Sequence, residues 1–163
     1  MKQLPEKIAL DKAVHGQRRY QGSVEIQKMS RLLDILAGSD GKVDFSIQFD
    51  RAAKLLGKAK VSIKADLPLV CTISAKEFLF HVEIDSIVGF IDDLDYEEFI
   101  DNNMEASWVE NGFVKPLEII EDELILAVPD APFDDNFNNK VEQKVVLEQE
   151  KKPNPFDVLK SLK

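Results

Sequence analysis

Hydrophobic and polar residues alternate along three stretches in the middle of the chain. Alternation with a period of two puts the apolar residues of a strand on one face and its polar residues on the other, as in antiparallel sheets with one solvated face. The apolar members are Val43, Phe45, Ile47 and Phe49, then Val61, Ile63, Ala65 and Leu67, then Phe78, Phe80, Val82 and Ile84. The pattern predicts three strands of an antiparallel sheet with one buried face.

Helical spacing precedes these strands. Between Ile26 and Leu36, apolar residues recur at intervals of three and four, which lines one face of a helix. Ser23 is a suitable N-cap, and Gly38 is a suitable end. We therefore predict a helix that packs against the apolar face of the sheet.

A second apolar run lies between Pro116 and Pro129. Proline suits the first position of a helix, and the second proline would end it. A strand over residues 119–128 is the competing prediction, because this run is rich in Ile and Leu. The predicted fold class is α+β: an antiparallel sheet, either open or curled like a barrel, with one or two packing helices and a flexible C-terminal tail.

The last third of the chain changes character. Residues 1–129 are predicted to form a single α+β domain, and residues 130–152 lack an apolar period and resemble a flexible linker. A short amphipathic helix would follow, completing a tail over residues 130–163. Its apolar side is predicted to dock on a partner, or alternatively to pack back on its own sheet, through Phe156, Leu159 and Leu162.

Charge is distributed unevenly along the 163 residues. The net charge is −9, yet residues 1–80 carry 14 Lys and Arg against 9 Asp and Glu, whereas residues 81–163 carry 7 against 21. This asymmetry favours a basic working surface in one half and a solvating or partner-directed acidic half. The alternative is that the two halves neutralise each other across the fold.

Candidate catalytic and metal-binding residues are scarce. Cys71, His15 and His81 are the only thiol and imidazoles, whereas a structural zinc site usually needs four such ligands. We therefore expect no metal, no cofactor and no enzyme activity. A single cysteine fits a reducing cytoplasm, and no apolar run indicates a secretory signal or a membrane span, so we expect a cytoplasmic protein without membrane association.

Basic residues near an aromatic ring indicate a nucleic-acid surface in the first half. Even-numbered lysines share one face of the second predicted strand, at a spacing close to that of phosphates on an extended strand. Two arginines precede a tyrosine that could stack on an RNA base. The candidate RNA-binding residues are Arg18, Arg19, Tyr20, Lys58, Lys60 and Lys64. Alternatively, these lysines form cross-strand pairs with acids such as Glu77, Glu83 and Asp85.

Three motifs resemble one known family. The segments 20–22 (Tyr-Gln-Gly), 121–129 and 152–162 are similar to the YceD family, the large ribosomal RNA subunit accumulation proteins. The family commonly carries a Cys-x-x-Cys pair before the third strand, whereas this chain has Cys71 and Ser74. Any metal or redox role of that pair is therefore not carried over to this chain.

The resemblance implies a role without catalysis in 23S ribosomal RNA accumulation or processing during large-subunit biogenesis. Two mechanisms are compatible with the residues. The first is direct binding of the ribosomal RNA precursor, rather than DNA, by the basic half. The second is a protein-binding adaptor or chaperone, in which the acidic half engages a basic ribosomal protein or an assembly enzyme.

Overall fold

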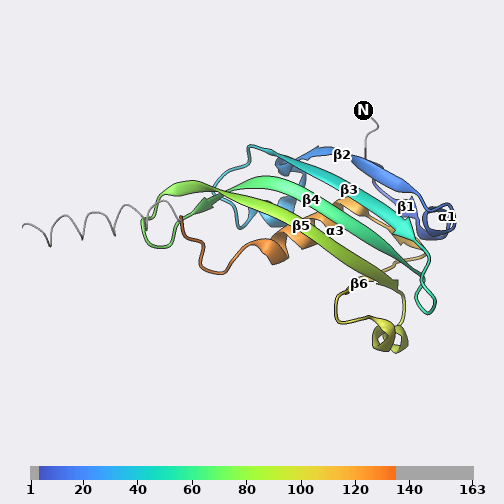
Figure 1. Cartoon of the computed structure of the whole chain (residues 1–163). Coiled ribbons are helices and arrows are strands. Elements are labelled where there is room, and N and C mark those ends of the chain that lie inside the picture. The colour runs from blue at the N-terminus through green and yellow to red at the C-terminus, as the bar shows by residue number, and fades with distance from the viewer. Residues whose placement is uncertain (1–3, 135–163) are drawn as a thin grey trace, which may run out of the picture.

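A five-stranded sheet forms the body of the protein in the computed structural model, which describes residues 4–134. Its order is β2 (Arg19–Glu25), β3 (Lys42–Asp50), β4 (Gly57–Val70), β5 (Glu77–Ile91) and β6 (Glu105–Trp108). Successive strands pair antiparallel from β2 to β5, whereas β6 lies parallel to β5 (Figure 1). Within the described residues β2 and β6 are the two edges and do not pair, so the sheet is open rather than a closed barrel.

The inner face of the sheet is the main hydrophobic core. All four apolar residues of the first alternating stretch are buried on β3, and their polar neighbours point to the outer face. Phe49 of β3 stacks on Phe90 of β5, with ring centroids 5.7 Å apart. The three predicted strands are thus confirmed, and β4 and β5 form a hairpin longer than the alternation alone indicates.

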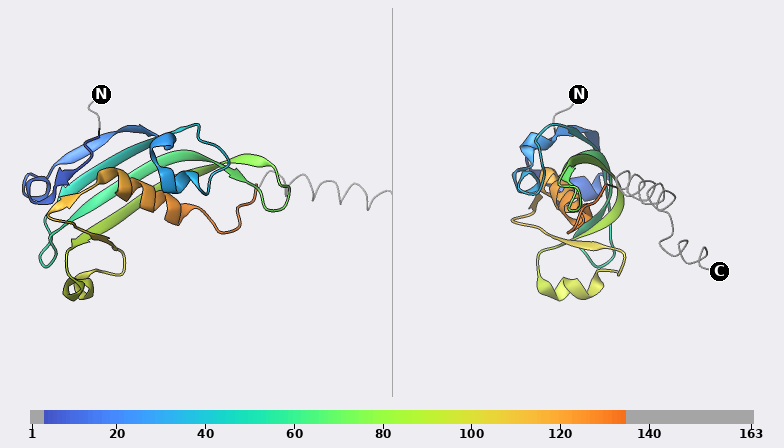
Figure 2. Two further views of the ribbon diagram at one scale, coloured as in Figure 1. Left: turned by 180° about the vertical axis from the view of Figure 1, so that it is seen from behind. Right: turned by 90° about the vertical axis from the view of Figure 1, so that its left-hand side faces the viewer.

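Helix α3 (Pro116–Ala127) lies lengthwise along the inner face (Figure 2). Pro116 occupies its N-terminal turn, where the missing N–H removes no helical hydrogen bond. Ile120 and Leu124 are fully buried between this helix and the sheet. The helical prediction for this run is confirmed, and the competing strand is wrong, because the buried positions recur at helical intervals.

One end of the sheet is closed by elements that the apolar pattern does not predict. The short helix α1 (Leu10–His15) packs on β3 and β4, between β1 (Ile8–Ala9) and β2. The β1 strand pairs antiparallel with β7 (Phe113–Val114), so the N-terminal segment lies beside the strand that leads into α3. Val14 of α1 approaches Gly57 so closely that a Cβ at that glycine would overlap its side chain.

The predicted helix between Ile26 and Leu36 is largely wrong. Ser23 does not cap a helix but lies within β2, because pairing with β3 continues as far as Glu25. Only a 3-10 turn, η1 (Ile26–Lys28), and one turn of α-helix, α2 (Ser30–Leu33), follow. The predicted packing role is nevertheless confirmed, since Ile26, Met29 and Leu32 are all fully buried.

Two further segments complete the described chain. The acidic stretch after β5 forms a 3-10 helix, η2 (Leu94–Phe99), in a loop at the β6 edge of the sheet (Figure 1). After α3, residues 130–134 stay on the body: the Pro132 carbonyl accepts a hydrogen bond from the Thr72 N–H at 2.8 Å. The docking prediction for Phe156, Leu159 and Leu162 lies outside the described residues.

Candidate functional site

Four of the predicted cations lie near one end of the sheet, and three of them, Arg19, Lys58 and Lys60, share its outer face. In the register of the sheet, Arg19 of β2 lies opposite Gln48 of β3, and Gln48 lies opposite Lys60 of β4. Two strand spacings therefore separate the two cations, a distance of about 9.5 Å between backbones. Lys58 lies two residues before Lys60 along β4, whereas Arg18 directly precedes β2 and its side chain lies beside Gly16 in the turn after α1.

None of these cations forms an ion pair within the described residues. Arg19 donates a hydrogen bond from Nε to the Ser46 hydroxyl at 3.1 Å, which leaves its charge unneutralised. Asp50 is the register partner of Lys58, but it accepts a hydrogen bond from Gln17 at 3.3 Å instead. We call the set Arg18, Arg19, Lys58 and Lys60 the basic corner.

Lys64 lies farther along β4 and behaves differently. Its ammonium group is 2.6 Å from Oε1 of Glu83, its register partner on β5. This carboxylate raises the pKa of Lys64 above its ordinary value. The cross-strand alternative from the sequence therefore applies to Lys64 but not to the basic corner.

Tyr20 does not join the cations. It alternates with Arg19 along β2, so it lies on the inner face, where its ring makes an edge-to-face contact with Phe49 at 5.9 Å. The ring belongs to the partly buried margin of the core. The sequence predicts an RNA base stacked on Tyr20 beside the arginines, but the ring lies on the opposite face of β2 from Arg19 and packs against the core.

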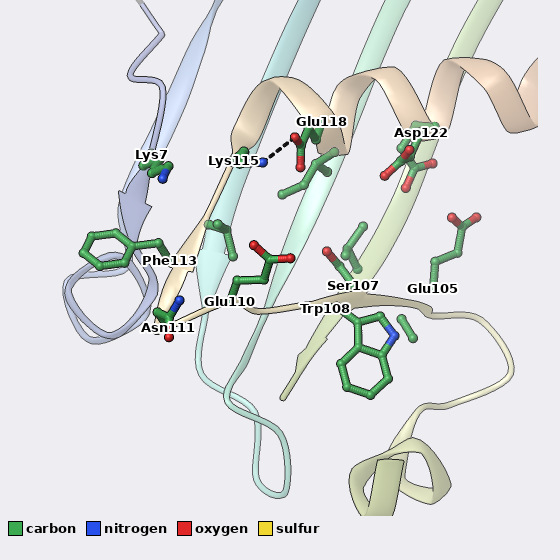
Figure 3. A pocket seen from close by; sticks show the side chains of 15 residues that line it. Lys7, Glu105, Ser107, Trp108, Glu110, Asn111, Phe113, Lys115, Glu118 and Asp122 are labelled. Atoms are coloured by element: carbon green, nitrogen blue, oxygen red, sulfur yellow. Dashed lines mark hydrogen bonds and ion pairs between the residues drawn. The ribbon is translucent and has the colours of Figure 1, made fainter. Parts of the chain in front are cut away.

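A second surface, which the sequence does not predict as a site, lies between β6 and α3 (Figure 3). It is a cavity of about 360 Å³ with five carboxylates and two lysines in its lining. We call it the acidic groove; its ionisable residues are Lys7, Glu105, Glu110, Lys115, Glu118, Asp122 and Glu123. The acidic composition of the second half is the only sequence signal for it, because the parallel pairing of β6 has no signature in a four-residue strand.

Two of the groove carboxylates are neutralised by cations. Lys115 contacts Glu118 at 2.7 Å, and Arg31 of α2 contacts Asp122 at 2.7 Å. Glu105, Glu110 and Glu123 have no ion pair within the described residues. The groove therefore keeps an excess of negative charge.

Glu123 is the most buried of these carboxylates, with 4% of its surface exposed. Burial raises its pKa above the ordinary value, and the nearby charge of Glu105 acts in the same direction. The neighbouring Ser86 side chain partly offsets this shift. The buried Ser86 Oγ nevertheless has no partner within hydrogen-bonding geometry in the described part of the chain.

The adjacent Glu121 has a structural role. Its Oε1 accepts hydrogen bonds from the backbone N–H groups of Arg31 at 2.7 Å and Leu32 at 3.1 Å, and Oε2 accepts from the Arg31 guanidinium at 3.0 and 3.2 Å. These N–H groups belong to the first turn of α2, where a helix leaves its donors unsatisfied. Glu121 thereby joins α2 to α3 through a buried carboxylate.

Cys71 lies buried in a turn at the far end of the β4–β5 hairpin. The backbone N–H groups of Ser74 and Asp134 each donate to its Sγ at 3.5 Å. Hydrogen bonds from the Ser74 side chain first, and then from these N–H groups, lower the pKa of the thiol to about 7. The serine in place of a second cysteine thus stabilises the Cys71 thiolate.

Residues 4–134 contain no group of three or more His, Cys, Asp or Glu side chains placed to hold a metal ion. Nor does that part of the chain include a helix long and apolar enough to cross a membrane.

Comparison with known proteins gives a full-length similarity. The chain is 28% identical over 177 residues to the large ribosomal RNA subunit accumulation protein YceD of Haemophilus influenzae, covering 96% of this chain and 95% of that protein. The chain is thus distantly similar to YceD over almost its full length. The predicted resemblance to the YceD family is thereby confirmed. YceD is named for the accumulation of the large ribosomal RNA subunit, and that name states no catalytic activity. No family model matches the chain, and neither does any solved structure.

Proposed function

We propose that the protein is a non-catalytic cytoplasmic factor for the accumulation and processing of 23S ribosomal RNA in large-subunit biogenesis. It binds the ribosomal RNA precursor through the basic corner. The full-length relation to YceD supports the process, and the cluster of four unpaired cations at one corner of the sheet supports the mechanism.

The geometry of the corner suits a phosphate backbone. Lys58 and Lys60 lie about 6.6–6.8 Å apart along β4, and Arg19 lies two strands away. Cations in such an array can contact successive phosphates without reading the bases. None of the four side chains has to break an ion pair in the described chain before it contacts a phosphate. RNA binding would therefore displace only water and counterions.

The test is a charge reversal of the corner. Changing Arg18, Arg19, Lys58 and Lys60 to Glu should weaken binding to 23S ribosomal RNA fragments transcribed in vitro. Each phosphate contact contributes about −0.7 to the slope of log affinity against log salt on single strands, so loss of four contacts should flatten the slope by about 3. Stability should change little, since surface substitutions usually stay within about 0.5 kcal/mol each.

A matched variant separates the corner from overall charge. Changing Lys28, Lys42, Lys64 and Lys76 to Glu alters net charge equally at exposed positions elsewhere. This control should keep most of the affinity and the original salt slope. Equal binding by both folded variants and the parent protein would refute the RNA mechanism.

A second candidate is the protein-binding adaptor or chaperone for a basic ribosomal protein or an assembly enzyme. The acidic groove favours it, because three carboxylates there lack a cation in the described residues. In that case the corner variant would bind RNA like the parent, while groove variants would lose a protein partner.

A further inference from the structure

We propose that the acidic groove binds a basic, extended segment of a partner protein, which pairs with the free edge of β6 and directs arginine or lysine side chains at the groove carboxylates. This inference rests on the adaptor function and is independent of the RNA site.

The first support is a buried carboxyl group that no cation in the described chain neutralises. Glu123 lines the groove with 4% of its surface exposed and has no ion pair in residues 4–134. A buried carboxylate without a cation is costly, and it is normally paired. Glu105 and Glu110 lie at the same groove and are exposed, so an incoming cation can reach the site from solvent.

The second support is the edge of the sheet. All four residues of β6 line the groove, and the strand pairs only with β5 in the described chain. Its other side therefore presents N–H and C=O groups that an extended peptide can pair with. Main-chain pairing would hold the ligand at a fixed register beside α3.

The direction of the β6 side chains predicts the pattern of the ligand. Glu105 and Ser107 point toward α3, whereas Trp108 points to the opposite side of the strand (Figure 3). Side chains of an added strand alternate in the same way. Basic residues at alternate positions would therefore face the carboxylates, and apolar residues between them would lie on the side of Trp108, whose surface is 53% exposed.

The groove favours this occupant over other cations and over nucleic acid. Its excess negative charge repels phosphates, and the described residues offer no metal-binding cluster. A polyamine could neutralise the carboxylates but could not pair with the backbone of β6. The polypeptide is the ligand that uses both features.

Blocked pentapeptides test the proposal with the full-length protein. One probe alternates arginine and valine, and its control has the same composition with the three arginines adjacent. By titration calorimetry, the alternating peptide should bind at least about fivefold more tightly than the control. All three of its arginines lie on one face of a strand, whereas the adjacent arginines of the control are divided between the two faces. Spermidine is the third probe and should bind more weakly than the alternating peptide.

Matched charge variants locate the binding. Changing Glu105, Glu110 and Glu123 to Gln should weaken binding of the alternating peptide by about tenfold or more. Changing Asp95, Glu97 and Glu98 of η2 to Asn or Gln alters net charge equally at exposed positions and should change affinity by less than about twofold. If the buried substitution impairs folding, the Glu105→Gln, Glu110→Gln double variant is compared with the Glu97→Gln, Glu98→Gln double variant, which removes the same charge.

Three results would overturn the inference. They are equal losses in the groove and η2 variants, equal affinity for the two pentapeptides, and spermidine binding as tightly as the alternating peptide. None of them bears on the basic corner, because RNA is absent from the experiment. Conversely, unchanged RNA binding by the corner variant would leave the peptide result standing.

Discussion

Burial and hydrogen bonding alter the acidity of two side chains in opposite directions. Glu123 is removed from water without a cation, so its pKa is raised. Cys71 is equally buried, yet donors surround its sulfur and its pKa falls to about 7. At both positions the immediate neighbours determine the charge state, and residue type alone predicts neither shift.

Glu123 should reduce stability at neutral pH. When a carboxyl group has a higher pKa in the folded than in the unfolded protein, the protein loses stability as the pH increases through the folded pKa. The reason is that the folded state resists ionisation of the group. Glu123→Gln should therefore raise Tm at pH 7, and the difference should vanish below a pH of about 4, where Glu is protonated in both states. Thermal unfolding across pH checks this, with Glu98→Gln at an exposed position of η2 as the control. A lower Tm at pH 7 would contradict it.

The Cys71 thiol should titrate near pH 7. Ser74→Ala should raise its pKa part of the way toward the ordinary value of about 8.5, because the Ser74 side chain is the largest cause of the shift and the backbone donors remain. Ultraviolet absorbance of the thiolate measures this directly, since the chain has one cysteine. Thr72→Val serves as the control in the same turn. An unchanged midpoint in Ser74→Ala would show that the backbone N–H groups suffice.

At the scale of elements, regular alternation is a better guide than helical spacing. The alternating stretches predict β3, β4 and the first part of β5, because one buried face dictates a period of two. The spacing between Ile26 and Leu36 satisfies a helix equally well, but pairing of β2 with β3 takes the residues up to Glu25 into the sheet. Such competition between a local pattern and a partner strand cannot be resolved from local sequence.

The short helix α2 depends on a residue about ninety positions away. Glu121→Ala should lower the free energy of unfolding by about 1–3 kcal/mol, because it leaves the buried N–H groups near Arg31 without acceptors. Exposed Glu118→Ala, which removes only the ion pair with Lys115, should change it by less than about 1 kcal/mol. Urea unfolding monitors both. Equal effects would mean that Glu121 contributes no more than a surface ion pair.

At the scale of the whole molecule, the charge asymmetry of the sequence becomes two separate surfaces. The cations predicted as one site divide, because Lys64 pairs with Glu83 while Arg18, Arg19, Lys58 and Lys60 stay together. Tyr20 lies on the other face. The acidic groove depends on the parallel placement of β6 beside β5, and no local pattern predicts it. The charge distribution of the sequence therefore indicates a basic and an acidic surface. Strand register decides which residues belong to each.

The pairing of β1 with β7 also affects the order in which the strands can pair during synthesis. Ile8 and Ala9 are synthesised about a hundred residues before their partners, Phe113 and Val114. At about 5–20 residues per second, the first strand waits roughly 5–20 s for its partner. The strands from β2 to β5 each pair with the next in the chain, so they can associate during that interval. We therefore expect β1 to pair with β7 after the strands from β2 to β5 have associated.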